Sequence, residues 1–128
     1  DVSNRSSPIL LNNKEILYIA GNSVVRFDLE SRKRRYIIGF DGGGIGCMAL
    51  NKDENILFVG EKGNWPSIYV YSFPDFSILK RLRGGAETGY VYIDINCDGS
   101  KICSVGMNPD LSLTVWDWMN EKMILRTK

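Results

Sequence analysis

Residues 112–116 read SLTVW and restate the pattern of residues 67–71, SIYVY, at a distance of 45 positions. The same shift places the NKD of residues 51–53 on the NCD of residues 96–98 without a gap. Self-similarity at a fixed spacing is the sequence sign of a repeat architecture, in which each copy is one small structural unit. The chain is therefore predicted to consist of similar units in series.

A third and weaker copy precedes these two. Residues 16–20 match residues 56–60 at a shift of 40, and residues 24–29 match residues 68–73 at a shift of 44. The difference predicts that one loop between strands is four residues shorter in the first copy. A period of 40–45 residues with four short strands per unit is typical of a β-propeller blade, whereas ankyrin and tetratricopeptide repeats are shorter and helical.

The composition favours strands over helices. The 128 residues include 13 Ile and 8 Val but only 3 Ala, and 13 are Gly. Branched side chains suit a pleated sheet, and a chain poor in Ala and rich in Gly disfavours long helices. Short spacers indicate antiparallel hairpins. We expect an all-β fold, with strands at residues 46–50, 56–61, 67–72, 77–83, 90–96, 101–105, 112–117 and 123–127.

The repeats divide the chain into about three blades, at residues 8–40, 42–84 and 85–128. Propellers close with 4–8 blades, so three blades form an incomplete propeller. Each blade buries its faces on its neighbours, which leaves one apolar face open at either end of the series. We expect the isolated chain to self-associate, as a dimer that closes six blades, or to be part of a longer chain.

Residues 113–117, LTVWD, resemble the closing signature of a WD repeat. In that family a Trp on the third strand, a Ser on the second, an Asp in the turn between them and a His after Gly form a structural tetrad. The resemblance assigns three of these roles to Trp116, Ser104 and Asp110, and Asp117 completes the Trp-Asp pair.

The tetrad departs from the family pattern in this chain. Residues 84 and 85 are both Gly where the family has Gly-His, so the tetrad cannot close and we expect a looser hydrogen-bond network. Tyr71 and Phe27 take the Trp position in the other two repeats, where we expect them to pack as core aromatics.

Loop residues give a more specific resemblance. Residues 61–66 read EKGNWP, residues 82–90 read LRGGAETGY, and residues 124–126 read ILR. Together they resemble the WD-repeat family of cilia- and flagella-associated proteins, most strongly from residue 42 to the end. The resemblance implies a large scaffold in the cytoplasm and cytoskeleton, in the axoneme of the cilium or flagellum. Its implied role is to tether inner-arm dynein heads to the doublet microtubule, with tubulin as a further partner.

The composition argues against an enzyme. The chain contains no His, which excludes Ser-His-Asp and Cys-His nucleophile systems and His-ligated metals. The carboxylates show no spacing typical of acid–base catalysis or of a calcium loop; they include Asp53, Glu54, Glu87, Asp94, Asp98 and Asp110. We expect a non-catalytic scaffold that binds proteins and uses no cofactor or metal.

Two further features carry no functional assignment. Gly44, Gly46 and Ala49 match a dinucleotide fingerprint, but that site needs a strand, a helix and a βαβ unit, so we expect a flexible connection between blades. The net charge is +1, and no apolar run approaches the ~20 residues that span a bilayer. We therefore expect neither a nucleic acid nor a membrane as partner.

The resemblance to WD repeats favours the loops at residues 60–66, 84–89 and 107–111 as the interaction face. The candidate contact residues are Lys62, Asn64, Trp65, Glu87, Tyr90 and Asn108. Trp65 is a large ring in a turn, which makes it either a contact residue or a ring folded back over the edge of its own blade.

A basic rim is the alternative binding surface. Residues 32–35 read RKRR, and further cations lie on the equivalent outer strand of the next blade. The candidate rim consists of Arg32, Lys33, Arg34, Arg35, Lys80, Arg81 and Arg83. These side chains would bind the acidic surface of a microtubule, or they would simply solvate a hairpin. A generic WD-repeat scaffold of another cytosolic complex is a third possibility.

The three cysteines indicate a reducing compartment. Cys47, Cys97 and Cys103 are too few and too unevenly spaced for a disulfide framework or a zinc site. If residues 98 and 99 form a hairpin turn, Cys103 faces Asp94 across the hairpin. Cys97 and Cys103 are then not opposed in disulfide geometry.

Overall fold

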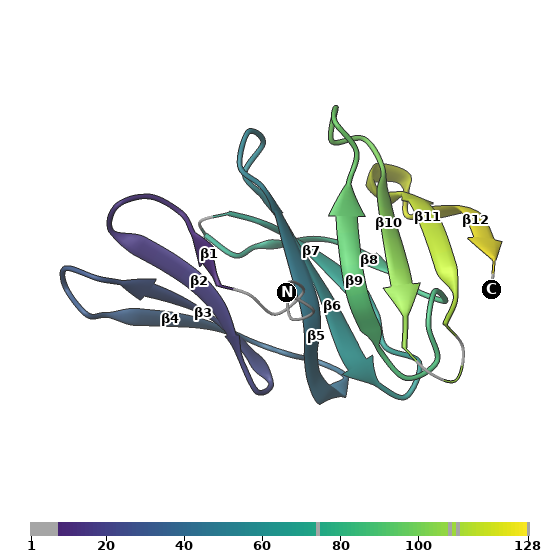
Figure 1. Cartoon of the computed structure of the whole chain (residues 1–128), viewed down its shortest axis with the longest axis horizontal. Coiled ribbons are helices and arrows are strands. Elements are labelled where there is room, and N and C mark those ends of the chain that lie inside the picture. Colours follow the sequence, from purple (N-terminus) through teal and green to yellow (C-terminus); the bar gives the residue numbers. More distant parts are fainter. Residues whose placement is uncertain (1–7, 74, 108, 110, 128) are drawn as a thin grey trace.

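The computed structural model describes residues 8–73, 75–107, 109 and 111–127, and the described strands form three sheets of four strands each. Figure 1 shows the sheets side by side in chain order. Blade 1 consists of β1 (Ile9–Leu10), β2 (Glu15–Ala20), β3 (Ser23–Asp28) and β4 (Arg34–Ile38). Blade 2 consists of β5 (Gly42–Asn51), β6 (Ile56–Gly63), β7 (Ile68–Ser72) and β8 (Ile78–Leu82). Blade 3 consists of β9 (Tyr90–Ile95), β10 (Ile102–Gly106), β11 (Leu113–Asp117) and β12 (Lys122–Thr127), with the 3-10 helix η2 (Trp118–Asn120) before its last strand.

Every pair of neighbouring strands in the three blades is antiparallel. The predicted all-β class is therefore confirmed, and the architecture is that of consecutive blades of a WD-type propeller.

The turn between β9 and β10 shows how local sequence sets the register. The Asp98 carboxylate accepts a hydrogen bond from the amide of Ser100 at 2.9 Å, and Gly99 takes a φ of 77°. Gly adopts this left-handed conformation without the steric cost of a side chain. Cys103 pairs with Asp94, as the sequence predicted, and Cys47, Cys97 and Cys103 form no disulfide bonds.

The described residues bury two apolar cores, each between two blades. Side chains alternate across a strand, so each strand of blade 2 contributes to both cores. The core between blades 1 and 2 contains Leu17, Val24, Ile37, Ile45, Met48, Leu57, Val59, Tyr69 and Tyr71. The core between blades 2 and 3 contains Cys47, Phe58, Ile68, Val70, Leu82, Ala86, Tyr90, Ile93, Ile102, Trp116 and Trp118.

The glycine-rich stretch at residues 42–46 is not the expected flexible connection. It forms the start of β5 and pairs with β6 through two register shifts. A Cβ on Gly46 would lie 2.0 Å from the carbonyl oxygen of Tyr90, so the missing side chain lets β5 approach β9 closely. The glycines therefore serve strand packing between blades 2 and 3.

The alignment of the first repeat was wrong by one residue. Ile16 pairs with Phe27, as Leu57 pairs with Tyr71 and Ile102 with Trp116. The shift between β2 and β6 is thus 41, and the loop is three residues shorter instead of four. A slip of one residue moves every side chain of a strand to the other face. The run ILYIA at residues 16–20 lacks polar positions that would reveal the slip.

Candidate protein-binding loop surface

Backbone hydrogen bonds join three loops into one surface, which we call the loop surface (residues 60–66, 83–89, 107, 109 and 111). The amides of Gly63 and Trp65 donate to the carbonyls of Thr88 and Glu87 at 3.0 and 2.9 Å. The amide of Met107 donates to the carbonyl of Gly89 at 2.9 Å. Strands β6 and β10 both end at this edge, the lower one in Figure 1. The loops are therefore fixed to one another across blades 2 and 3.

Large apolar side chains stand exposed on this edge. Trp65 is 55% exposed and Leu111 is 57% exposed, and both have positive φ angles, of 52° and 48°. Such a conformation costs a non-Gly residue about 1–2 kcal/mol, so the surrounding bonds must hold it. The Trp65 side chain is thus more than half exposed on a backbone that is held in place by hydrogen bonds.

The other predicted contact residues differ in accessibility. Asn64 is exposed, whereas Lys62 and Glu87 are half-buried beside the backbone bonds that join the loops. The prediction of Tyr90 as a contact residue was wrong. Its side chain is fully buried, and its hydroxyl accepts a hydrogen bond from the Gly85 amide at 3.1 Å. Its position at the start of β9 turns the ring into the core. Asn108 lies outside the described residues.

Polar side chains also fix the connection between blades 1 and 2, which lies at the same edge of the sheets. One oxygen of the buried Glu61 carboxyl accepts the amides of Phe40 and Asp41 at 2.8 and 2.9 Å. Desolvation raises the pKa of Glu61, and the two amides only partly oppose it. The Phe40 ring, 59% exposed, lies 4.9 Å from the Tyr69 ring. Glu61 thereby fixes the turn that presents Phe40.

The Asp41 carboxylate extends this network into blade 2. It accepts the Ser67 amide at 2.9 Å and the Tyr69 hydroxyl at 3.1 Å, and Arg81 lies 3.9 Å away. Arg81 also donates to the Ser67 hydroxyl at 2.9 Å. No local motif in the sequence marks Asp41, Glu61 and Tyr69, because these residues meet only through the pairing of β5, β6 and β7 in blade 2.

The tetrad residues meet inside blade 3. The indole nitrogen of Trp116 donates to the Ser104 hydroxyl at 2.9 Å, and both side chains are buried. Gly85 packs on the Trp116 ring where the family has His, and its carbonyl accepts the Ser112 hydroxyl at 2.8 Å. Asp117 accepts the Asn120 side-chain amide at 2.8 Å. Asp110 lies outside the described residues.

The candidate basic rim is interspersed with acids. The four cations at residues 32–35 are exposed, as is Arg83, while Lys80 is half-buried. The amides of Glu30 and Ser31 hold the pKa of the neighbouring Asp28 carboxyl below its usual range, so it stays ionised beside them. Arg81 is engaged by Asp41 and Ser67 at the blade junction. The rim is therefore a mixed surface with a local excess of cations.

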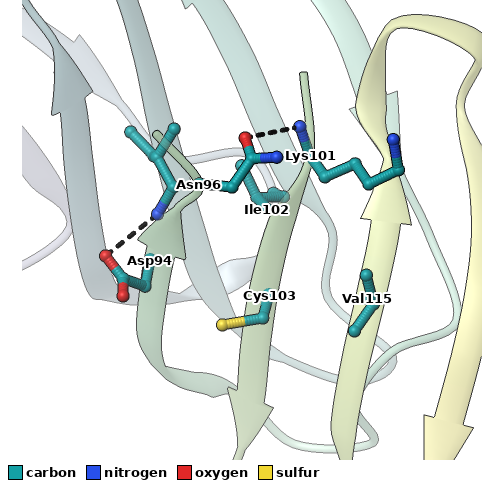
Figure 2. A pocket seen from close by; sticks show the side chains of 7 residues that line it. Asp94, Asn96, Lys101, Ile102, Cys103 and Val115 are labelled. Atoms are coloured by element: carbon teal, nitrogen blue, oxygen red, sulfur yellow. Dashed lines mark hydrogen bonds between the residues drawn. The ribbon is translucent and has the colours of Figure 1, made fainter. Parts of the chain in front are cut away.

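Metal-ligating side chains do not gather in the described residues. These residues hold no group of three His, Cys, Asp or Glu side chains that could bind a metal. A hollow of about 280 Å³ on blade 3 is lined by Asp94, Ile95, Asn96, Lys101, Ile102, Cys103 and Val115. One carboxylate oxygen of Asp94 accepts the amide of Ile95, and the side-chain oxygen of Asn96 accepts the amide of Lys101, both at 3.0 Å. Figure 2 shows both hydrogen bonds. Within the described part of the chain, no helix has the length and apolar character needed to cross a bilayer.

Comparisons with known proteins agree with the resemblance drawn from the loops. No family model matches the chain. The chain is 38% identical over its whole length to cilia- and flagella-associated protein 44 of Mus musculus, and 36% identical to the protein of the same name from Chlamydomonas reinhardtii. Over 84% of its length it is 28% identical to cilia- and flagella-associated protein 43 of Mus musculus. The chain spans 7%, 8% and 6% of the lengths of these three relatives. The predicted resemblance to cilia- and flagella-associated proteins is confirmed, with a higher identity to protein 44 than to protein 43.

Proposed function

We propose that this chain is a protein-binding part of a ciliary scaffold, and that it binds axonemal partners through the loop surface. The observation that carries the proposal is the exposed Trp65 ring on loops bonded to one another through their backbones. The names of the relatives, proteins associated with cilia and flagella, support a place in the cytoskeleton of these organelles.

The role we propose within the axoneme is that of a tether without chemistry of its own. By the family resemblance, such a tether links inner-arm dynein heads to the doublet microtubule. The absence of His from the sequence supports a non-catalytic role. The buried network around Asp41 and Glu61 also supports it, because its polar groups serve the backbone at the blade junction.

The loop surface has the physical properties of a binding site. A Trp ring brings 150–250 Å² of surface into an interface at a small cost in conformational entropy. Fixed loops lose little further freedom on binding, which raises the affinity obtained from a given contact area. Trp is also enriched among the residues that dominate the free energy of binding.

A second candidate function is microtubule binding through the basic rim. The observation in its favour is that all four cations at residues 32–35 are exposed, at the turn before β4 and at the start of that strand. Contacts of this kind with an acidic surface weaken steeply as salt screens the charges. The two candidates therefore differ in both the residues and the salt dependence that they predict.

Co-sedimentation of the purified chain with demembranated axonemes tests the proposal. Trp65→Ala is expected to weaken binding by about 2 kcal/mol or more, roughly thirtyfold in affinity. Met119→Ala is the matched control, because Met119 is 58% exposed but lies in η2, away from the loop surface. Thermal melts establish that both variants stay folded.

The same assay separates the two surfaces. The proposal predicts that replacing residues 32–35 with Ser leaves binding within a factor of two or so at moderate salt, because exposed charges contribute little there. Unchanged binding of Trp65→Ala, together with loss of binding in the Ser variant at low salt, would overturn the loop surface and favour the rim.

A further inference from the structure

A second exposed aromatic ring lies beside the loop that carries Trp65. Phe40 is 59% exposed, close to the 55% of Trp65, and its ring lies 4.9 Å from the Tyr69 ring of β7. Phe40 belongs to the connection between blades 1 and 2. The Trp65 loop is bonded on its other side to residues 87–88, in the connection between blades 2 and 3. The two rings therefore mark the two connections of the middle blade.

The segment that carries Phe40 is fixed along the Trp65 loop. The amides of Phe40 and Asp41 donate to the Glu61 carboxyl, four residues before Trp65, at 2.8 and 2.9 Å. The Asp41 carboxylate accepts the Ser67 amide, two residues after Trp65, at 2.9 Å. These bonds hold both ends of the loop to one short segment of the neighbouring connection.

Gly63 lets the two segments approach each other. Its φ is 143°, and a Cβ there would lie 2.3 Å from the carbonyl oxygen of Asp41. A side chain at this position would therefore force the segment of Phe40 away from the loop of Trp65. On the other side of the loop, the Gly63 amide donates to the Thr88 carbonyl at 3.0 Å. The two rings thus stand on one bonded unit of backbone.

The charged groups next to the Phe40 ring are engaged within the chain. The Asp41 carboxylate accepts the Tyr69 hydroxyl at 3.1 Å, and the Arg81 guanidinium lies 3.9 Å from it. Arg81 also lies 5.4 Å from the centre of the Tyr69 ring, and Glu61 is fully buried. These pairings leave the Phe40 ring to make the contact with a partner, which favours an apolar group of that partner over a charged one.

We infer that Phe40 is a second anchor residue for the protein that binds the loop surface, and that this partner has two apolar recesses, one for each ring. The inference rests on the proposed function, because it adds Phe40 to the surface that Trp65 defines. Aromatic side chains are enriched at the centres of protein interfaces, where a few residues carry most of the free energy of binding. Because the backbone bonds already order both rings, neither needs to be fixed on binding.

Co-sedimentation with demembranated axonemes tests the inference, with thermal melts to establish folding. Phe40→Ala is expected to weaken binding roughly tenfold, since it removes one of the two rings. Ile78→Ala is the matched control and is expected to leave binding unchanged. Ile78 is 51% exposed on β8, but it pairs with Tyr71, at the end of the strand away from the loop surface.

Photo-crosslinking gives a second measurement that keeps the ring and so does not depend on the folding of Phe40→Ala. A photoreactive phenylalanine derivative at position 40 is expected to crosslink to the same axonemal protein as one at position 65. Loss of binding in Trp65→Ala, with full binding in Phe40→Ala, would overturn the second anchor and leave the proposed function standing. Crosslinks from position 65 with none from position 40 would do the same. Full binding in both variants would overturn the inference and the proposed function together.

Discussion

Glu61 is the residue whose chemistry depends most on the fold. Its side chain is fully buried, and one carboxyl oxygen binds two backbone amides while the other finds no hydrogen-bond partner among the described residues. Gly39 packs against it so closely that a Cβ would lie 2.8 Å from the bonded oxygen. A carboxylate in this site gives up most of its hydration, so burial favours the protonated form and raises the pKa.

The raised pKa fixes the sign of a prediction for Glu61→Gln. A carboxyl whose pKa is higher in the folded state stabilises the protein fully below its unfolded pKa, near the ordinary value of 4.5. That contribution is lost as the pH rises through the folded pKa. Glu61→Gln keeps an acceptor for the two amides and does not ionise. The free energy of unfolding of Glu61→Gln, measured relative to that of the unchanged chain, is therefore expected to increase from pH 4 to pH 8.

Urea unfolding at the two pH values measures this difference. Glu61→Ala is the control, since it leaves two part-buried amides without an acceptor and is expected to cost about 1–3 kcal/mol at pH 4. Because Ala does not ionise either, this deficit is expected to shrink at pH 8 by about the amount that Glu61→Gln gains. If the free energy of unfolding of Glu61→Gln instead decreases relative to that of the unchanged chain as the pH rises, then the carboxylate, and not the neutral acid, is the stabilising form.

Individual residues were predictable from the sequence where a local pattern marks them. Trp65 stands out as an aromatic ring in a turn, and Trp116 with Ser104 follows the spacing of a known repeat. Tyr90 was wrong as a contact residue, because nothing in the loop sequence distinguishes the last exposed position from the first buried one. Asp41 and Glu61 are 20 residues apart, and the pairing of β5 with β6, in which Gly42 lies opposite Gly63, brings them together.

The strands and their register could be predicted mostly where the residues of the connecting turns mark them. The turn at residues 96–101 carries Asp and Gly in the positions that such turns demand, and its register was predicted correctly. The register of β2 was wrong, because a run of apolar residues fits either face of a strand. The start of β5 was missed, because Gly is rare in strands and marks this one only through its close approach to β9.

The outer strands explain the cations of the candidate rim. Each outer strand carries two cations: Arg34 and Arg35 on β4 and Lys80 and Arg81 on β8 belong to the rim, and Lys122 and Arg126 on β12 lie outside it. An outer strand offers unpaired backbone groups to other chains, and cationic side chains are a common protection against such pairing. The position of these cations thus has a structural cause that does not involve a binding partner.

Replacing residues 32–35 with Ser is accordingly expected to change the free energy of unfolding by no more than about 1 kcal/mol. The Arg34 guanidinium lies 4.8 Å from the Phe27 ring centre, and such exposed contacts contribute only about 0.5–1 kcal/mol. Urea unfolding of the variant checks the value. A loss of several kcal/mol would mean that the turn is part of the packing of blade 1.

At the scale of the whole molecule, the apolar cores and the candidate binding surfaces occupy different places. The two cores between the blades hold the three sheets together, while the loop surface and the rim lie on different parts of the strands' ends and outer edges. Blade 2 is covered on both faces, and the described parts of blades 1 and 3 are covered on one. This arrangement presents Trp65 from the middle blade, the one that is held from both sides.

The most direct test of binding through the loop surface is site-specific photo-crosslinking in a ciliated cell. A photoreactive residue is placed at position 65 on the loop surface or, in a parallel sample, at position 33 in the exposed basic turn. We predict that position 65 crosslinks to another axonemal protein and that position 33 does not. Crosslinks from position 33 to tubulin, with none from position 65, would contradict binding through the loop surface.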